Sequence, residues 1–167
     1  MGEPVVKDDR IYRYQDYKGW PDEERWELID GVAYNMSPAP STGHQTIVTQ
    51  LVSAIHTFQG KGGCRVFTAP FDVLLPESPD QPDDEVSNVV QPDLAIICDP
   101  SKLKPFGCVG APDWLIDPGN RFVHVYVLGS DGRYPKPALH VGAATVKSTV
   151  CPGFELRLEE LFAAIPG

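Results

Sequence analysis

The chain has 167 residues, of which 42% are hydrophobic and 22% are charged, the composition of one ordinary globular domain. This balance excludes collagen, a coiled coil and wholesale disorder, and the 15 glycines and 17 prolines predict short elements separated by many turns. The formal net charge is −9, so the field of the whole molecule repels nucleic acid, and phosphate binding needs a metal ion or a local basic patch. No apolar stretch approaches the roughly 18 residues of a membrane span.

The cysteines carry no metal-binding pattern. Cys64, Cys98, Cys108 and Cys151 are separated by 34, 10 and 43 residues, which fits neither a zinc ribbon nor a zinc finger. We therefore expect each to be a small buried apolar residue, with its thiol reduced in a cytoplasmic protein.

The first elements predicted along the chain are a helical turn and a hairpin. Proline and acidic residues at 20–25 favour a short helix or turn. Asp30-Gly31 separates the apolar runs 26–30 and 32–36, and Asp-Gly in that position is the strongest short signal for a β-hairpin.

One long helix follows. Apolar residues recur at helical intervals and predict one buried face: Ile47, Val48, Leu51, Ile55 and Phe58. Ser41 or Thr42 can cap this helix, which we expect to run from about His44 to Gln59 and to end at Gly60.

The rest of the chain predicts strands. Residues 65–75 form an extended run that is bent or bulged at Pro70. An acidic loop at 76–87 leads to a strand at 89–98, which is apolar on both faces after Asp93 and therefore central. Residues 114–118 and 121–128 form a second hairpin. The chain ends with a short strand at 152–158 and a helical turn at 159–164.

Asp93 is the residue whose position favours chemistry. It follows a proline at the start of a buried strand, where a carboxylate is unfavourable unless it is paired, hydrogen-bonded or bound to a metal ion. The structural alternative is a carboxylate that accepts hydrogen bonds from loop amides.

Motifs throughout the chain help to decide between a chemical and a structural role for Asp93. In order, they are Glu27-Leu-Ile-Asp-Gly31, Met36-Ser-Pro-Ala-Pro40, His44-Gln45, Ala69-Pro-Phe-Asp-Val73, Val90-Gln-Pro-Asp-Leu94, Gly110-Ala-Pro-Asp113, Trp114-Leu-Ile-Asp-Pro118 and Cys151-Pro-Gly-Phe-Glu155. In this order they resemble the Uma2 (Uma-two) family over residues 12–163. That family is described as restriction endonuclease-like, within the PD-(D/E)XK nuclease fold.

The resemblance implies a metal-dependent site. In such nucleases two carboxylates hold Mg²⁺, which orients a water molecule and stabilises charge on the scissile phosphate, while a lysine assists the water. Asp93 matches the first metal-binding aspartate and Glu27 an acidic residue of the early hairpin. His44, with Gln45, matches a pair at the start of the main helix, where amide donors suit a phosphate; a packing role for His44 is the alternative.

The chain departs from the family after Asp113. The resemblance implies a strand ending in glutamate and a helix with a lysine between the segments that end at Asp113 and begin at Trp114. In this sequence Asp113 is followed directly by Trp114, without these elements. Asp117 can take the place of the missing glutamate, or Asp113 can complete the site, but no lysine follows. The segment is missing from the sequence or was lost by a natural deletion.

Together these observations predict a single α/β (α+β) restriction-endonuclease-like domain over residues 1–167, a mixed twisted sheet with one main helix packed on it. The resemblance implies a Mg²⁺- or Mn²⁺-dependent DNA endonuclease, intact or degenerate, with no membrane partner, and it allows a homodimer. The alternative is a non-catalytic binding module with the same fold. A basic face near Lys61, Arg65, Lys102 and Lys104 would favour the nuclease.

Overall fold

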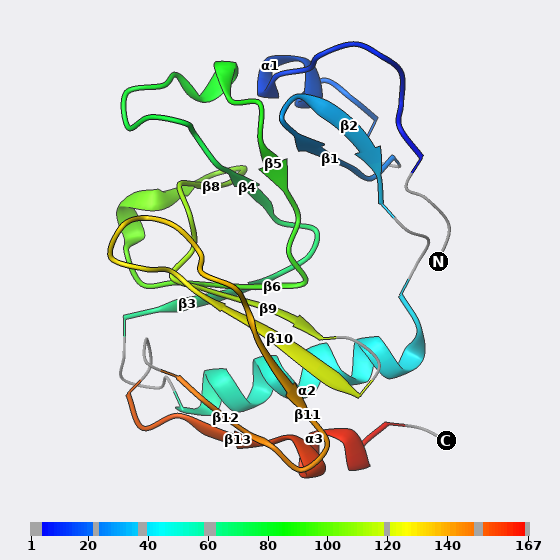
Figure 1. Ribbon diagram of the computed structural model, residues 1–167, viewed down its shortest axis with the longest axis vertical. Helices are drawn as coiled ribbons and strands as arrows, with labels where there is room; N and C mark the ends of the chain where they lie inside the picture. Colours follow the sequence, from blue (N-terminus) through cyan, green and yellow to red (C-terminus); the bar gives the residue numbers. More distant parts are fainter. Residues whose placement is uncertain are drawn as a thin grey trace. The chain divides into compact units, whose positions relative to one another are not determined.

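The computed structural model (Figure 1) describes residues 5–21, 24–36, 40–58, 63–118, 121–148 and 152–165. The chain divides into two compact units. The first comprises Met1–Ala39, Phe71–Gln91 and Lys102–Ala111, and the second comprises Pro40–Pro70, Pro92–Ser101 and Pro112–Gly167. Among the described residues, no helix has both the length and the hydropathy of a membrane-spanning helix.

The first unit is built on a six-stranded mixed sheet in the order β2-β1-β5-β4-β8-β7. All pairs are antiparallel except β4 and β8, which are parallel. The strands are β1 (Trp26–Ile29), β2 (Val32–Asn35), β4 (Asp72–Leu74), β5 (Val89–Val90), β7 (Leu103–Lys104) and β8 (Gly107–Val109), with helices α1 (Tyr14–Tyr17) and η1 (Asp83–Glu85). Its core is rich in aromatic side chains, including Tyr12, Tyr14 and Trp26.

The hairpin predicted at Asp30-Gly31 is confirmed. Ile29 pairs with Val32 across the turn, and both turn residues have positive φ, 50° at Asp30 and 79° at Gly31. Positive φ at both central positions is the conformation that a two-residue hairpin loop requires, which explains the Asp-Gly pair.

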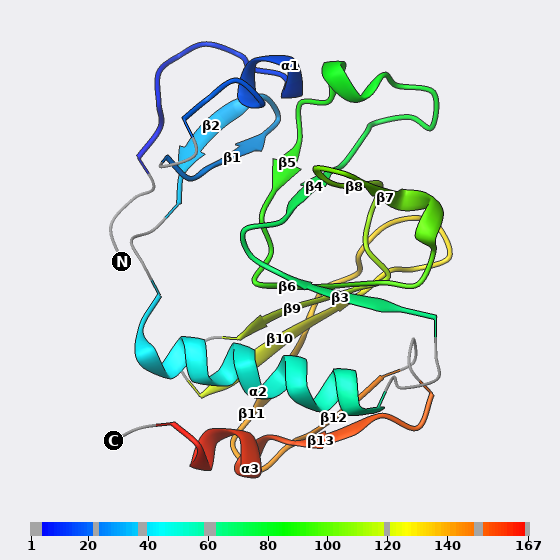
Figure 2. The same ribbon diagram turned by 180° about the vertical axis from the view of Figure 1, so that it is seen from behind.

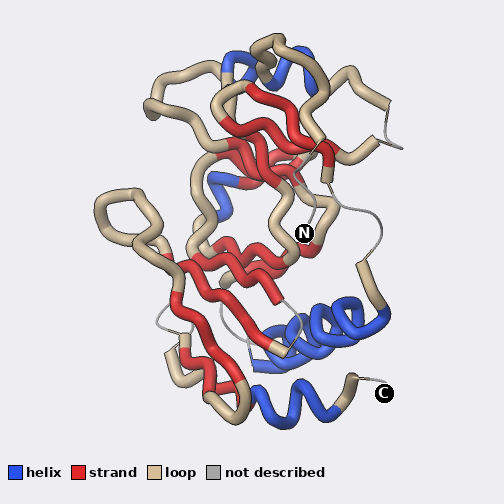
Figure 3. Tube along the Cα trace, turned by 45° about the vertical axis from the view of Figure 1, so that its right-hand side comes forward, coloured by secondary structure: helices blue, strands red, loops and turns tan. Residues whose placement is uncertain are grey.

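The second unit contains an antiparallel five-stranded sheet in the order β11-β10-β9-β6-β3. These strands are β3 (Arg65–Thr68), β6 (Leu94–Ile97), β9 (Trp114–Pro118), β10 (Phe122–Val127) and β11 (Ala138–Val141). The helix α2 (Thr42–Phe58) covers one face of this sheet (Figures 1 and 2). Beyond α2 lie the paired strands β12 (Thr145–Lys147) and β13 (Glu155–Arg157) and the helix α3 (Leu158–Ala163), seen again in Figure 3.

The main helix packs as its periodicity predicts. Ile47, Leu51 and Ile55 are buried in one cluster with Leu94 and Trp114 of the sheet. The helix begins two residues before the predicted start at His44, and its predicted end at Gln59 and Gly60 lies outside the described residues. The fold class is therefore confirmed, a mixed α+β structure with one main helix on a sheet.

The structure divides two of the predicted strands. The run 65–75 becomes β3 and β4, and the run 89–98 becomes β5 and β6, each pair in different sheets. Prolines 70 and 92 lie at these breaks and cannot donate a ladder hydrogen bond. β6 is central, between β3 and β9, as expected. Strands β7, β8, β11 and β12 were not predicted, because their sequences are short or poorly patterned.

The prediction of reduced thiols is wrong for Cys64 and Cys98, which form a disulfide. The two cysteines flank the pair Arg65 and Ile97 in the antiparallel register of β3 and β6, and their Cα atoms lie 3.9 Å apart. Sequence separation alone does not reveal such a register. Cys108 is buried, as expected, and its Sγ donates to the Gly110 carbonyl at 3.6 Å, whereas Cys151 lies outside the described residues. The cytoplasmic location, from which reduced thiols were expected, stays a prediction.

The junction at Asp113 and Trp114 leads directly into β9. The Asp113 N–H donates to the Ile96 carbonyl at 3.0 Å, and the Asp113 carbonyl accepts the Leu128 N–H at 3.1 Å. Trp114 is fully buried and pairs with Ile96. The junction thus belongs to the sheet, and a missing family segment stays a prediction.

Candidate active site

The centre of the candidate site is Asp93, immediately before β6 in the second unit. Its backbone carbonyl accepts the Ala69 N–H at 3.3 Å. Its Oδ1 lies 3.3 Å from Nε2 of His44, and the two side chains are 32% and 22% exposed. The structure therefore brings together two residues that are far apart in sequence and leaves both of them partly accessible.

His44 lies in the first turn of α2, where backbone amides have no partner within the helix. Ser41 caps this end, because its Oγ accepts the His44 N–H at 3.2 Å. The positive end of the helix dipole therefore lies at His44, a position that favours an anion. The capping role predicted for Ser41 is confirmed.

Asp117 and Asp113, the two candidates for a further metal-binding carboxylate, both have partners within the five-stranded sheet. The exposed Asp117 of β9 lies across from His124 of β10, with 3.5 Å between Oδ2 and Nδ1. Asp93 and Asp117 directly adjoin the last pair of the β6–β9 register, Leu94 and Ile116. Asp113 instead accepts the Cys98 N–H at 2.8 Å through Oδ2, so it is tied to the end of β6.

Glu27, in β1 of the first unit, is hydrogen-bonded to Gln91, which precedes Asp93 by two residues in the chain. Its Oε1 accepts the backbone N–H of Gln91 at 2.7 Å. Gln91 Oε1 accepts two hydrogen bonds from Arg25, and Gln91 Nε2 donates to Tyr17 and to Asp72 at 3.0 and 2.9 Å. Every polar group of the Gln91 side chain is thus engaged.

Tyr17 completes this network, since its hydroxyl donates to Asp72 Oδ1 at 3.0 Å. Burial raises the pKa of Tyr17, and the neighbouring Asp72 carboxylate raises it further. Burial, followed by the negative charges of Asp72, Asp83 and Asp84, raises the pKa of Tyr14 to about 12. Both phenols therefore remain protonated at neutral pH, and the Tyr17 hydroxyl is a donor to Asp72.

Sequence reasoning missed the roles of Gln91, Arg25, Tyr17 and Asp72. Gln91 and Asp72 lie inside motifs that the sequence shows, Gln-Pro-Asp and Pro-Phe-Asp, but neither motif indicates a partner. Only the pairing of β5 with both β1 and β4 places these side chains in one unit.

The described residues do not assemble a complete metal cluster. Among them, no group of three or more His, Cys, Asp or Glu side chains is arranged to hold a metal ion. The residues of the predicted basic face are divided between the two units: Arg65 belongs to the second unit, and Lys102 and Lys104 belong to the first. Lys61 lies outside the described residues, and the basic face stays a prediction.

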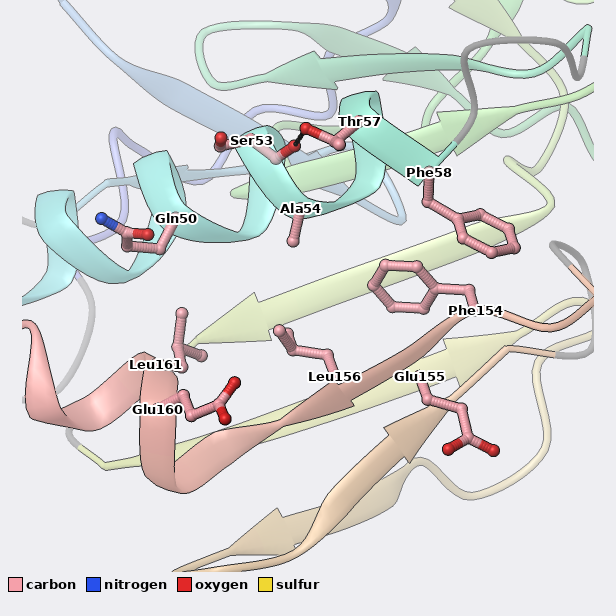
Figure 4. Close-up of a pocket in the computed structure, with 10 residues that line it drawn as sticks. All are labelled: Gln50, Ser53, Ala54, Thr57, Phe58, Phe154, Glu155, Leu156, Glu160 and Leu161. Atoms are coloured by element: carbon pink, nitrogen blue, oxygen red, sulfur yellow. Dashed lines mark hydrogen bonds between the residues drawn. The ribbon is translucent and has the colours of Figure 1, made fainter.

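A separate groove in the second unit lies between α2 and the β13–α3 segment (Figure 4). Phe58, Phe154 and Leu156 form its apolar part, and Glu155 and Glu160 lie at its border. These two carboxylates are paired with Lys147 and Arg157. The groove contains none of the predicted site residues.

Comparison with known proteins agrees with the resemblance seen in the sequence. Residues 14–114 match the Uma2 family, described as "Putative restriction endonuclease", so the chain belongs to this family. The match ends at the Asp113–Trp114 junction.

Solved structures show the same fold. One is a crystal structure described as "a putative nuclease belonging to DUF820" from Anabaena variabilis ATCC 29413, with a TM-score of 0.64 and 17% identity. The similarity covers 91% of this chain and 98% of that one. No curated protein matches the chain. Fold and family are therefore nuclease-like.

Proposed function

We propose that this chain is a metal-dependent DNA endonuclease of the PD-(D/E)XK type. The observation that carries the proposal is the Asp93–His44 pair beside the first turn of α2, in a chain of the Uma2 family. An accessible carboxylate, an imidazole and a positive helix end together provide groups that can bind a metal ion, move a proton and bind a phosphate.

The donor set fits Mg²⁺ or Mn²⁺ with few protein ligands. Mg²⁺ keeps several water molecules and is usually bound by one or two carboxylates together with substrate phosphates. Asp93 would supply the first carboxylate. Glu27 and Asp117 remain the proposed further ligands, although Glu27 already accepts one N–H and Asp117 lies beside His124. When bound, the metal ion would activate water and stabilise negative charge on phosphate.

The chain's own groups then have distinct roles in the proposal. The amides of the first turn of α2 orient the phosphate, and Nε2 of His44 holds or releases a proton beside Asp93. Glu27 holds the N–H of Gln91, two residues before Asp93 in the chain, and so restrains the backbone that leads to the site.

Calorimetric titration of Mn²⁺ tests the site. Wild type should bind Mn²⁺, and Asp93→Ala should bind at least about tenfold more weakly, as expected for loss of a charged ligand. Asp80→Ala removes an exposed loop carboxylate and is the matched control, which should bind as wild type does. Equal binding by Asp93→Ala and wild type would exclude Asp93 as a ligand.

Plasmid nicking in Mg²⁺ or Mn²⁺, with EDTA as the blank, tests the reaction itself. We expect nicking by wild type and its loss in Asp93→Ala, with a weaker defect in His44→Gln because the phosphate-binding amides remain.

A second candidate is a non-catalytic module that keeps the nuclease fold. It is favoured by the net charge of −9 and by the described residues, which contain no cluster of three metal-ligating side chains. Mn²⁺ binding without nicking would support this candidate and overturn the endonuclease.

A further inference from the structure

A row of aromatic side chains follows β10 on one face of the five-stranded sheet. Phe122, His124 and Tyr126 alternate along the strand, with ring centroids 5.2 Å and 6.5 Å apart. Tyr134, from the connection to β11, extends the row at 6.2 Å from Tyr126. Successive rings are inclined by 60°, 67° and 83°, so they do not cover one another by parallel stacking.

The row lies on the face opposite α2. Val123 and Val125 alternate with the rings and are buried in the same cluster as the helix. On the neighbouring strand, Leu139 pairs with His124 and Val141 with Phe122, so these side chains lie on the same face as the rings. Leu139 and Val141 are 58% and 54% exposed, which leaves this part of the sheet face accessible.

Basic residues lie close to members of the row in the sequence. Arg121 directly precedes Phe122, and Arg133 and Lys136 lie on either side of Tyr134 in the sequence; all three are exposed. On the same face, Asp117 is paired with His124. Three exposed basic residues thus adjoin members of the row in the sequence of a chain whose total charge is −9.

We propose that this aromatic row, defined by Phe122, His124, Tyr126 and Tyr134, binds single-stranded nucleic acid by stacking on unpaired bases. The inference rests on the proposed nuclease function and specifies its substrate as a strand with accessible bases. Aromatic rings on a sheet stack bases without sequence preference, and neighbouring arginines and lysines contact the phosphates.

The spacing favours a single strand over a duplex. Alternate residues of a strand are about 6.8 Å apart, whereas stacked bases in a duplex rise about 3.4 Å per nucleotide. Each ring can therefore accept one base only if the bases are unstacked from their neighbours. The negative total charge weakens attraction to a duplex, whose binding depends mainly on phosphate contacts.

Fluorescence anisotropy with a labelled oligothymidylate in EDTA tests the row without any cleavage. Wild type should bind the single strand more tightly than a duplex of equal length. Loss of a ring in Phe122→Leu or Tyr126→Leu should weaken binding about tenfold, because these variants keep an apolar side chain but lack a stacking surface. Tyr126→Trp should restore binding, and Arg121→Ala should reduce its salt dependence.

The matched control is Phe58→Leu, which removes an exposed ring from the end of α2. It should bind as wild type does, and circular dichroism should confirm that all variants fold. No binding of the single strand by wild type, or equal binding by the Leu variants, would overturn the aromatic row while leaving the Asp93 experiment unaffected. Self-association of wild type that is lost in the Leu variants, measured by light scattering, would instead identify the row as a homodimer contact.

Discussion

At the scale of single residues, the Cys64–Cys98 disulfide joins two segments of the second unit that are separated in the sequence by a segment of the first unit. The chain leaves the second unit after Pro70 and returns at Pro92, and the bridge spans 34 residues of sequence. Closing a loop of this length removes conformational entropy from the unfolded chain and contributes about 4 kcal/mol in the chain-entropy model.

We therefore expect Cys64→Ser, or reduction of wild type, to lower the free energy of unfolding by about 3–4 kcal/mol. Urea denaturation with and without dithiothreitol measures this change. The reductant should have no effect on Cys64→Ser. If reduction leaves the urea midpoint of wild type unchanged, the two cysteines are not paired in the folded protein.

The buried phenols predict a dependence of stability on alkaline pH. The folded pKa of Tyr14 is about 12 and that of Tyr17 is also raised, whereas a phenol in the unfolded chain titrates near 10. The unfolded state therefore loses these protons first. The contribution of these two phenols to the free energy of unfolding is complete below about pH 10 and is lost as the pH rises through their folded pKa values.

Urea unfolding measured between about pH 9 and pH 12 should show this decline, and Tyr17→Phe should make it shallower, because one of the two phenols is then absent. Phe58→Leu, which removes a ring without a titratable group, is the control and should leave the slope unchanged. A Tyr17→Phe slope equal to that of wild type would contradict the prediction.

At the scale of elements, the turn between β1 and β2 depends on Gly31. Its φ is 79°, and a Cβ atom at this position would lie 2.5 Å from Ile11 Cγ2 and 3.1 Å from the Tyr12 carbonyl oxygen. Gly31→Ala therefore combines a left-handed conformation with a steric clash. We expect a loss of about 2–3 kcal/mol in the free energy of unfolding.

Gly110→Ala separates these two effects. Gly110 also has a positive φ, 94°, but a Cβ atom there would have no neighbour within 4 Å. Its loss should be only about 1 kcal/mol, from the left-handed conformation alone. Equal losses in the two variants would show that the contact with Ile11 and Tyr12 does not matter.

At the scale of the whole molecule, each compact unit consists of three separate segments of the chain. Unfolding one unit would lengthen the loops that connect the segments of the other, and longer loops have a greater closure entropy. We therefore expect the units to unfold together, as the predicted single domain of 1–167 requires.

The tryptophans report on the units separately. Trp20 and Trp26 belong to the first unit and Trp114 to the second. For Trp114→Phe, fluorescence and circular dichroism should give the same urea midpoint. The two measurements should likewise agree for the double variant Trp20→Phe/Trp26→Phe. Different midpoints within either variant would show that the units unfold independently.

The sequence by itself determined the elements whose signals are local. Asp30-Gly31 supports the positive φ values of its turn, and the spacing of Ile47, Leu51 and Ile55 places one face of α2 in the core. Family motifs indicated the nuclease-like fold, and they singled out Asp93 and His44, which the structure places 3.3 Å apart.

Only the tertiary structure decided which distant residues meet. The Cys64–Cys98 bridge depends on the register of β3 and β6, and the Gln91 network on the pairing of β5 with β1 and β4. Tyr134 likewise lies beside Tyr126 only in the folded connection between β10 and β11, which pair although β11 has no alternating pattern of its own. Strand register results from packing across the whole sheet, so neither residue spacing nor local propensity specifies it.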